Sequence, residues 1–296
     1  MPVTGFRNRK SGSKKHYMNR EQLYKQIQSK KTMLCVGLDV DYDKMPEHIK
    51  GLATSEVAIK GRLFGGKSRS IIEFNKAIID ATAPYCVAYK PNLAFYECYG
   101  DDGLRALEAT VEYIRTTYPE MFLIADAKRG DIGNTAKKYA KAFFEAMDFD
   151  AVTLSPYMGQ DSILPFLEYE GKWAIVLALT SNSSAEQFQM SEKGGKPLYR
   201  AVMEEMMSIS TPDNMMFVVG ATKAEKLSEI RSFCPDNFLL VPGVGAQGGS
   251  AEEVISHGAN DMGGLLINSS RGILYADSSQ NFAKAAAKVA ASTACI

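Results

Sequence analysis

The sequence predicts a single α/β domain folded as a (β/α)8 TIM barrel. Eight short runs of apolar, often β-branched residues recur along the chain, each with the length of a buried strand. Each run is followed by a segment in which apolar residues recur with the period of an amphipathic helix. The runs are hydrophobic almost throughout, as parallel strands covered on both faces are. Eight strand–helix pairs are what a closed barrel requires, whereas an open doubly wound sheet usually has fewer strands and one dominant glycine-rich first turn.

The elements follow one another in a regular order after a short polar helix at residues 19–30. The strands are expected at residues 33–38, 86–89, 122–125, 151–154, 173–179, 216–219, 238–241 and 265–267. The helices are expected at residues 70–82, 103–117, 134–147, 161–169, 197–209, 223–233, 250–257 and 280–291. Two connections are longer than usual, at residues 41–67 and 182–196. We expect both to lie over the catalytic rim or to act as lids.

The composition argues against several classes of protein. The 296 residues carry a net charge of zero, which gives no support for nucleic acid or an acidic membrane surface as partner. No apolar stretch approaches the ~18–20 residues that span a bilayer. The five cysteines are scattered without a C-x-x-C pair, which favours reduced thiols in a cytoplasmic protein. Residues 1–17 are basic and aperiodic, and we expect a disordered extension there, ahead of a barrel domain at residues 18–296.

The candidate site residues are the polar residues that directly follow the expected strands, because ligands of such barrels lie at the carboxyl ends of the strands. The segments at these ends are Gly37-Leu38-Asp39, Lys90-Pro91-Asn92, Asp126-Ala127-Lys128, Ser155-Pro156-Tyr157, Thr180-Ser181-Asn182, Pro242-Gly243-Val244-Gly245-Ala246-Gln247-Gly248-Gly249 and Asn268-Ser269-Ser270-Arg271-Gly272.

The segment after the third expected strand carries alternating charges. On an extended strand Asp126 and Lys128 point to the same face, because side chains repeat every two residues. Opposite charges within about 4–6 Å hold each other ionised. Asp131 follows the glycine that turns the chain, so it need not face the same pocket in the same subunit. Taken alone, a D-x-K motif is more often a surface ion-pair network.

The last two strand ends predict a phosphate site. The glycine-rich segment after the seventh strand precedes a helix near Ser250, so its N–H groups and the helix dipole would favour an anion. Arg271 follows the neighbouring strand and could form a bidentate contact with phosphate. The loops after strands seven and eight are the common phosphate site of this fold. The substrate is therefore expected to be a phosphorylated small molecule.

No metal site is expected at these strand ends. The three histidines, His16, His48 and His257, fall outside them, which excludes a histidine-rich metal site. Two aspartates with two interleaved lysines can neutralise each other without a divalent ion. No Ser-His-Asp or Cys-His arrangement is apparent either.

Together these motifs resemble the orotidine 5′-phosphate decarboxylase family. The residues that carry the resemblance are D-A-K-R-G-D-I-G-N-T at residues 126–135, with K-P-N before them and P-G-V-G-A-Q-G-G and S-R-G after them. They are most similar to the longer, type 2 group, in which the signature reads D-x-K-x-x-D-I-x-x-T. The resemblance extends from about residue 34 to residue 272. It implies cofactor-independent decarboxylation of orotidine 5′-phosphate (OMP) to UMP and CO2, the last step of de novo UMP biosynthesis.

The resemblance also implies roles for individual residues. Lys128 matches the lysine that protonates the C6 carbanion, and Asp126 matches the aspartate beside the substrate carboxylate. Asp131, Ile132 and Thr135 match residues that enter the active site of the partner subunit, which implies a homodimer with shared sites. The remaining matches are Asp39 and Lys90 at the ribose hydroxyls, Asn92 supporting this array, Thr180 and Ser181 at the pyrimidine edge, and Pro242, Gly245, Gln247 and Arg271 at the phosphate.

Three alternative functions remain open at this level. A 3-keto-gulonate-phosphate decarboxylase or hexulose-phosphate synthase shares D-x-K-x-x-D but uses a metal ion. A non-catalytic nucleotide sensor could use the same barrel, although it has little reason to keep a carboxylate that repels its ligand. An RNA-binding protein has only the basic amino-terminal segment in its favour.

Overall fold

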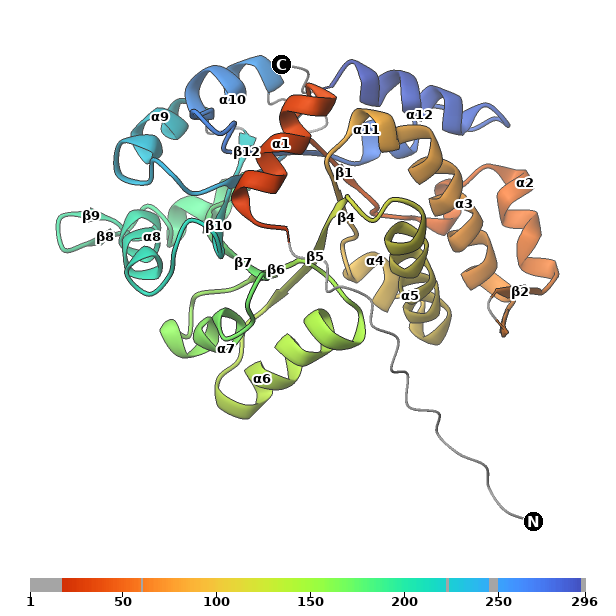
Figure 1. Cartoon of the computed structure of the whole chain (residues 1–296), viewed down its shortest axis with the longest axis horizontal. Helices are drawn as coiled ribbons and strands as arrows, with labels where there is room; N and C mark the ends of the chain where they lie inside the picture. The colour runs from red at the N-terminus through yellow and green to blue at the C-terminus, as the bar shows by residue number, and fades with distance from the viewer. Residues whose placement is uncertain (1–17, 60, 222–223, 245–249, 294–296) are drawn as a thin grey trace, which may run out of the picture.

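The computed structural model describes residues 18–59, 61–221, 224–244 and 250–293, and within them eight parallel strands close into a barrel (Figure 1). The strands follow the order β1-β12-β11-β10-β7-β6-β5-β4, and β4 closes the ring against β1. They are β1 (Leu34–Gly37), β4 (Ala88–Lys90), β5 (Phe122–Arg129), β6 (Ala151–Leu154), β7 (Trp173–Leu179), β10 (Met215–Val219), β11 (Leu239–Pro242) and β12 (Leu265–Ser269). The predicted fold class is confirmed.

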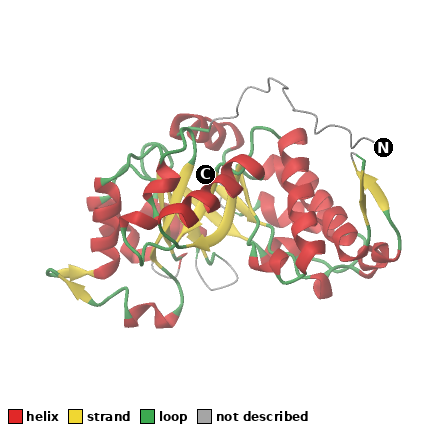
Figure 2. Cartoon of the chain, turned by 90° about the horizontal axis from the view of Figure 1, so that it is seen from below, coloured by secondary structure: helices red, strands yellow, loops and turns green. Residues whose placement is uncertain are grey.

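Helices surround the barrel, and most of them occupy the predicted positions (Figures 1 and 2). They are α3 (Gly66–Thr82), α5 (Gly100–Thr117), α6 (Gly133–Lys141), α7 (Leu164–Leu167), α8 (Leu198–Ser208), α9 (Ala224–Phe233), α10 (Ala251–Gly258) and α12 (Phe282–Ala291). Three further short helices are α2 (Glu47–Lys50), α4 (Ala94–Glu97) and α11 (Arg271–Leu274). Among the described residues, no helix is long and apolar enough to cross a membrane.

Two predicted helices differ in the structure. The helix expected at residues 161–169 is reduced to the 3-10 turn Gln160–Ser162 and the single turn of α7, which has Pro165 in its first turn. Proline lacks a backbone N–H and is tolerated only at the start of a helix, so the helix cannot run through this residue. The helix expected at residues 134–147 ends in a π-helical turn, Ala142–Ala146.

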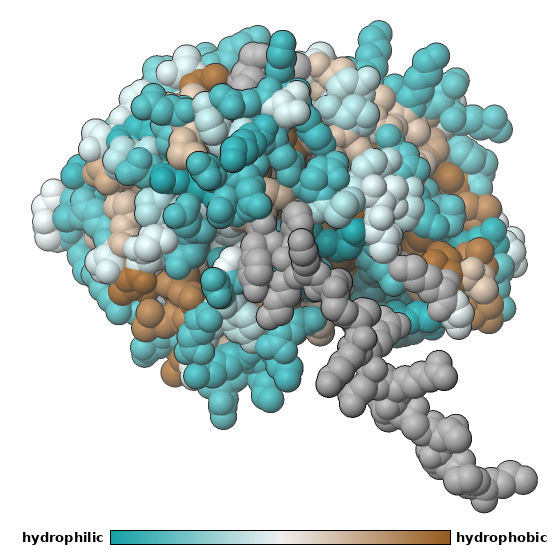
Figure 3. Space-filling view, in the orientation of Figure 1, coloured by the Kyte–Doolittle hydropathy of each residue, from teal (hydrophilic) through white to brown (hydrophobic). Residues whose placement is uncertain are grey.

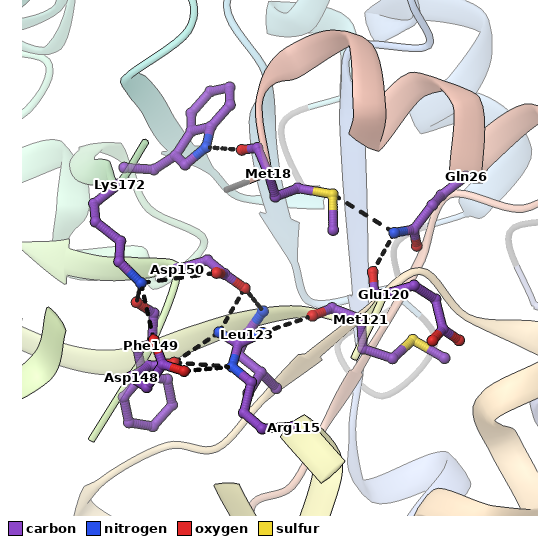
Figure 4. Close-up of polar contacts among 11 residues, drawn as sticks. Met18, Gln26, Arg115, Glu120, Met121, Leu123, Asp148, Phe149, Asp150 and Lys172 are labelled. Atoms are coloured by element: carbon purple, nitrogen blue, oxygen red, sulfur yellow. Dashed lines mark hydrogen bonds and ion pairs between the residues drawn. The ribbon is translucent and has the colours of Figure 1, made fainter. Parts of the chain in front are cut away.

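Helix α1 (Arg20–Lys30) packs against the apolar interior at the amino-terminal ends of the strands. Asn19 caps it through a reciprocal pair of hydrogen bonds with Gln22. Leu23 and Ile27, one turn apart on the same face, are fully buried. The indole nitrogen of Trp173, the first residue of β7, donates to the carbonyl oxygen of Met18 at 2.7 Å (Figure 4).

A buried ion cluster lies beside this helix (Figure 4). Asp150, directly before β6, is 0% exposed and pairs with the Arg115 guanidinium at 2.8 Å. The same carboxylate accepts a hydrogen bond from the backbone N–H of Leu123 at 2.8 Å. Lys172 donates to the carbonyl oxygen of Phe149 at 2.7 Å and lies 4.0 Å from Asp150. These contacts tie α5, β5 and the start of β7 together at the end of the barrel opposite the strand carboxyl ends.

The two long connections contain secondary structure that the sequence pattern did not indicate. The first holds α2, the 3-10 turns Tyr42–Lys44 and Gly51–Thr54, and the hairpin of β2 (Val57–Ile59) with β3 (Arg62–Phe64). The second holds the 3-10 turn Ser183–Gln187 and the hairpin of β8 (Glu192–Lys193) with β9 (Lys196–Pro197). The two hairpins lie at opposite sides of the molecule (Figure 2). The predicted disordered extension, residues 1–17, lies outside the described residues.

Candidate active site

A cleft of about 460 Å³ opens at the carboxyl ends of the barrel strands. Nine of the predicted site residues line it: Asp39, Lys90, Asn92, Asp126, Lys128, Thr180, Ser181, Pro242 and Arg271. They come from six different strand ends, which only the closure of the barrel brings together. Two further predicted residues, Gly245 and Gln247, lie outside the described residues.

Asp126 is the centre of the polar network in this cleft. Its carboxylate accepts a hydrogen bond from the Lys90 ammonium at 2.7 Å and another from the Lys128 ammonium at 2.6 Å. The hydroxyl of Thr153, from β6, donates to the same carboxylate at 3.0 Å. The three donors fix both oxygens of Asp126, so its orientation in the cleft is determined before any ligand binds.

The predicted proximity of Asp126 and Lys128 is confirmed, but the backbone that produces it is not a regular strand. Strand β5 continues through both residues to Arg129, and its register against β6 shifts between Ala125 and Arg129. Lys128 has a φ of 47°, in the left-handed region that is unfavourable for a residue with a side chain. Its backbone N–H donates to the Thr153 hydroxyl at 2.9 Å, which holds it in this conformation. Such local strain is typical of functional sites.

The charges in the cleft stabilise one another. Burial alone would raise the pKa of Asp126, but Lys90 and Lys128 outweigh burial and hold that pKa well below its usual range. Burial alone would lower the pKa of Lys90, but Asp126 and then Asp39 raise it above its usual value. Both residues are therefore ionised at neutral pH.

The remaining members of the array extend the cleft toward β1. Asp39 lies 3.9 Å from the Lys90 ammonium, and one of its oxygens is buried without a hydrogen-bond partner. Asn92 lies beside β5 and forms an isolated parallel bridge with Asp126. The buried Asp39 oxygen is the one that faces the Lys90 ammonium, beyond hydrogen-bond distance, so it is a buried acceptor without a donor among the described residues.

The opposite wall of the cleft is formed by the ends of β11 and β12. Pro242, Gly243 and Val244 line it from β11, and Arg271 lines it from the first residue of α11. The guanidinium is the only cation on this wall among the described residues that line the cleft. This placement agrees with the anion contact that the sequence predicts for Arg271.

Three predicted residues do not line the cleft of this chain. Asp131, Ile132 and Thr135 follow the turn after β5, and Ile132 is 46% exposed. The carboxylate of Asp131 accepts a hydrogen bond from the backbone N–H of Ile132 at 2.8 Å. These residues are predicted to serve another subunit, and their position outside the cleft leaves that prediction open.

The structure adds Thr153 to the cleft, and it also places there Asn182 and Asn268, two strand-end residues for which the sequence predicted no role. Thr153 interrupts the apolar run of β6 with a hydroxyl, and that interruption was an available signal. Asn268 is 7% exposed, and its side-chain oxygen has no hydrogen-bond partner. Asn182 also lines the cleft, next to Thr180. Among the described residues, no group of three or more His, Cys, Asp or Glu side chains is placed to share a metal ion.

Comparison with known proteins agrees with this geometry. A model of the orotidine 5′-phosphate decarboxylase / HUMPS family matches residues 32–286. The orotidine 5′-phosphate decarboxylase of Phocaeicola vulgatus is 53% identical over 274 residues, covering 92% of this chain and 95% of the relative. That of Christiangramia forsetii is 54% identical over 269 residues, covering 91% and 93%. The structure of OMP decarboxylase from Leishmania donovani superposes with a TM-score of 0.73 at 33% identity, covering 92% of this chain and 96% of that one. The chain therefore belongs to the orotidine 5′-phosphate decarboxylase / HUMPS family.

Proposed function

We propose that this chain is a carboxy-lyase that decarboxylates orotidine 5′-phosphate to UMP and CO2. The observation that carries the proposal is the Asp126 carboxylate, held between the ammonium groups of Lys90 and Lys128 in the cleft. A binding protein for an anionic ligand gains nothing from a fixed carboxylate, whereas a reaction that expels CO2 can use one.

Lys128 is the general acid of the proposed reaction. The bond between C6 and the carboxylate carbon breaks, CO2 leaves, and the electron pair stays on C6. The Lys128 ammonium stabilises this localised carbanion and then transfers a proton to it. Because the ammonium is already fixed by Asp126 at 2.6 Å, little reorganisation is needed during the step.

Asp126 has two functions in this proposal. It orients Lys128, and it lies beside the substrate carboxylate, where like-charge repulsion is relieved as CO2 departs. Transition-state stabilisation by Lys128 is the main term, since the contribution of ground-state repulsion is disputed in general. Lys90 and Asp39 bind the ribose hydroxyls and complete the alternating array.

Remote binding energy comes from the phosphate in this proposal. Arg271 and Gln247 grip the phosphate, with Pro242 and Gly245 beside it, and Thr180 and Ser181 contact the pyrimidine edge. Energy from these non-reacting groups can be used to close the site around the reacting carbon.

The proposed active enzyme is a homodimer. Asp131, Ile132 and Thr135 lie outside the cleft of their own chain, and we propose that they enter the cleft of the partner. The reaction itself needs neither a metal ion nor an organic cofactor.

The test is an absorbance assay of orotidine 5′-phosphate loss by enzyme pre-treated with EDTA, comparing wild type with Lys128→Ala. We expect metal-independent turnover by the wild type and a loss of at least about a thousandfold in the variant, since both the acid and the fixed cation are removed. Lys137→Ala, which removes an exposed lysine of α6, is the charge-matched control. Turnover that requires added Mg²⁺ and a phosphosugar substrate would instead assign the chain to the metal-dependent branch of the family.

A further inference from the structure

The segment that carries Asp39 leaves the barrel sheet and is held by side-chain hydroxyls. Strand β1 ends at Gly37, and its pairing with β4 ends at the same residue. From there on, three consecutive backbone carbonyl oxygens each accept a hydrogen bond from a side-chain hydroxyl. The donors are Ser270 for Gly37 at 3.3 Å, Tyr96 for Leu38 at 3.0 Å and Tyr275 for Asp39 at 3.2 Å. These hydroxyls satisfy backbone acceptors at the point where the ladder ends.

The hydroxyl of Tyr275 makes two hydrogen bonds to this segment. It donates to the carbonyl oxygen of Asp39 at 3.2 Å and accepts from the backbone N–H of Asp41 at 2.6 Å. A carbonyl oxygen can only accept and a backbone N–H can only donate, so the direction of both hydrogen bonds is unambiguous. A single hydroxyl group therefore fixes the spacing of the two peptide groups that flank Val40.

The position of Tyr275 is set by other parts of the molecule. Its ring stacks on that of Phe74, from α3, with the centroids 6.1 Å apart and the planes at 18°. Phe74 is fully buried. The backbone N–H of Tyr275 donates to the carbonyl oxygen of Arg271 at 3.1 Å and ends α11. The hydroxyl is therefore held in place independently of the segment that it binds.

The carboxylate of Asp39 is not fixed in the way that Asp126 is. Three donors hold the Asp126 carboxylate, whereas Oδ1 of Asp39 is buried without a hydrogen-bond partner. The Lys90 ammonium lies 3.9 Å from Oδ1, too far for a hydrogen bond. The direction in which Asp39 enters the cleft therefore depends on its backbone, which Tyr275 holds.

We propose that Tyr275 is a positioning residue that sets Asp39 for the recognition of ribose hydroxyls. The inference rests on the proposed function, in which Asp39 and Lys90 bind the ribose. A hydrogen bond from a hydroxyl to a carboxylate forms only at about 2.5–3.0 Å and weakens steeply with angle. Removal of the Tyr275 hydroxyl leaves the Asp39 carbonyl and the Asp41 N–H without this partner. Asp39 then moves relative to the ribose while the phosphate and base contacts stay in place.

The test compares UMP with its 2′-deoxy and 3′-deoxy analogues, which differ from it by one ribose hydroxyl each. Isothermal titration calorimetry on the wild type should show that UMP binds about tenfold or more tighter than the weaker of the two analogues, because a hydrogen bond to a charged carboxylate is lost. Asp39→Ala removes the carboxylate and should bring this affinity ratio close to one. That variant gives the limit for a complete loss of ribose recognition by Asp39.

Tyr275→Phe keeps the ring stack on Phe74 and removes only the hydroxyl. It should lower the ratio of UMP to deoxy-analogue affinity by about threefold or more, by weakening UMP and leaving the analogue nearly unchanged. The matched control is Tyr113→Phe. Tyr113 is likewise half-buried, and its hydroxyl donates to Asp80 at 2.6 Å, outside the cleft lining. This control should leave the ratio unchanged.

The outcomes separate the inference from the proposed function. If Asp39→Ala abolishes the ratio but Tyr275→Phe keeps it, or weakens UMP and the analogue by the same factor, the inference is wrong and the proposed role of Asp39 stands. If the wild type decarboxylates orotidine 5′-phosphate but binds UMP and both analogues equally, Asp39 does not read the ribose and the inference is also wrong. A wild type that neither turns over the substrate nor binds UMP would refute the proposed function itself.

Discussion

Asp126 faces two cations that differ in their access to the cleft. The Lys90 side chain is 4% exposed, whereas that of Lys128 is 49% exposed, although both contact the same carboxylate. Lys90 is therefore a buried counter-charge that holds Asp126 in place, and Lys128 is the cation that can reach a ligand. The pair-wise charge balance explains how a buried lysine and a buried aspartate remain ionised in the same wall.

Asp126→Asn tests this balance through stability. The change removes the main partner of a buried ammonium, so we expect the free energy of unfolding at pH 7 to fall by about 3 kcal/mol. This value lies at the low end of the range for removing one partner of a buried ion pair, because Asp39 still faces Lys90. The depressed pKa of Asp126 contributes stability above its unfolded value of about 4, and this contribution is lost as the pH falls below that value. The raised pKa of Lys90 contributes stability below about 10.4, which is lost at higher pH.

The measurement is urea unfolding of both proteins between pH 3.5 and pH 7. The difference between wild type and Asp126→Asn should shrink as the pH falls through about 4. Exposed Asp161, substituted in the same way, should show no such pH dependence. A variant more stable than the wild type at pH 7 would mean that the array stores repulsion rather than stabilising the fold.

At the scale of single elements, the strands were predictable because their burial is continuous. The runs at residues 151–154 and 173–179 coincide with β6 and β7, and the other barrel strands differ from the predicted ranges by one to a few residues at their ends. The D-x-K proximity followed from strand alternation, but the shifted register of β5 and the positive φ of Lys128 did not. Those depend on Thr153, which lies on a different strand and is 25 residues away in the sequence.

The contents of the two long connections could not be predicted for a related reason. The hairpins β2–β3 and β8–β9 have strands of three and two residues, too short to show a two-residue alternation. Only Phe64 among the residues of these strands is buried, so no continuous apolar pattern marks them. For the same reason the sequence did not indicate Gln189, whose side chain returns to hydrogen-bond Thr180.

The ion cluster around Asp150 gives a prediction at this scale. Asp150→Asn should lower the free energy of unfolding by about 3 kcal/mol, because Arg115 loses the charge that offsets its burial. The cluster lies at the amino-terminal ends of the strands, so kcat and KM measured well below the melting temperature should remain unchanged. Glu168→Gln removes an exposed carboxylate, 3.4 Å from Lys137, and should cost less than about 1 kcal/mol. A loss of activity without a loss of stability in Asp150→Asn would contradict this division between the two ends of the barrel.

At the scale of the whole molecule, several apolar side chains that follow the carboxyl ends of the barrel strands are exposed to solvent. Much of the face seen in Figure 3 is hydrophilic, with separate apolar patches. Exposed apolar side chains follow two neighbouring strands: Ile132 follows β5, and Tyr157 and Met158 follow β6. Tyr157 is 93% exposed. Leu164 of α7, which packs against α6, is also exposed. Grouped exposed apolar residues mark interaction surfaces, which supports the proposed dimer.

The proposed sharing of active sites between two subunits predicts that two inactive variants can complement each other. Asp131→Ala and Lys128→Ala should each be inactive as homodimers, because every site lacks one of the two groups. In a mixed dimer, one site combines Lys128 from the first chain with Asp131 from the second, and it is therefore intact. Unfolding and refolding an equal mixture should give half mixed dimers, each with one intact site of two. About one quarter of the wild-type activity should then return.

The control for this complementation is a mixture of Lys128→Ala with Asp126→Ala, since both groups lie in the same cleft. In such a mixed dimer the cleft of one chain lacks Lys128 and the cleft of the other lacks Asp126, so no intact site forms and activity should stay absent. If activity recovers when Lys128→Ala is mixed with Asp131→Ala, but not when it is mixed with Asp126→Ala, Asp131 acts in the cleft of the neighbouring subunit. No recovery in either mixture, with mixed dimers present by mass spectrometry of differently tagged chains, would place Asp131 in the site of its own chain.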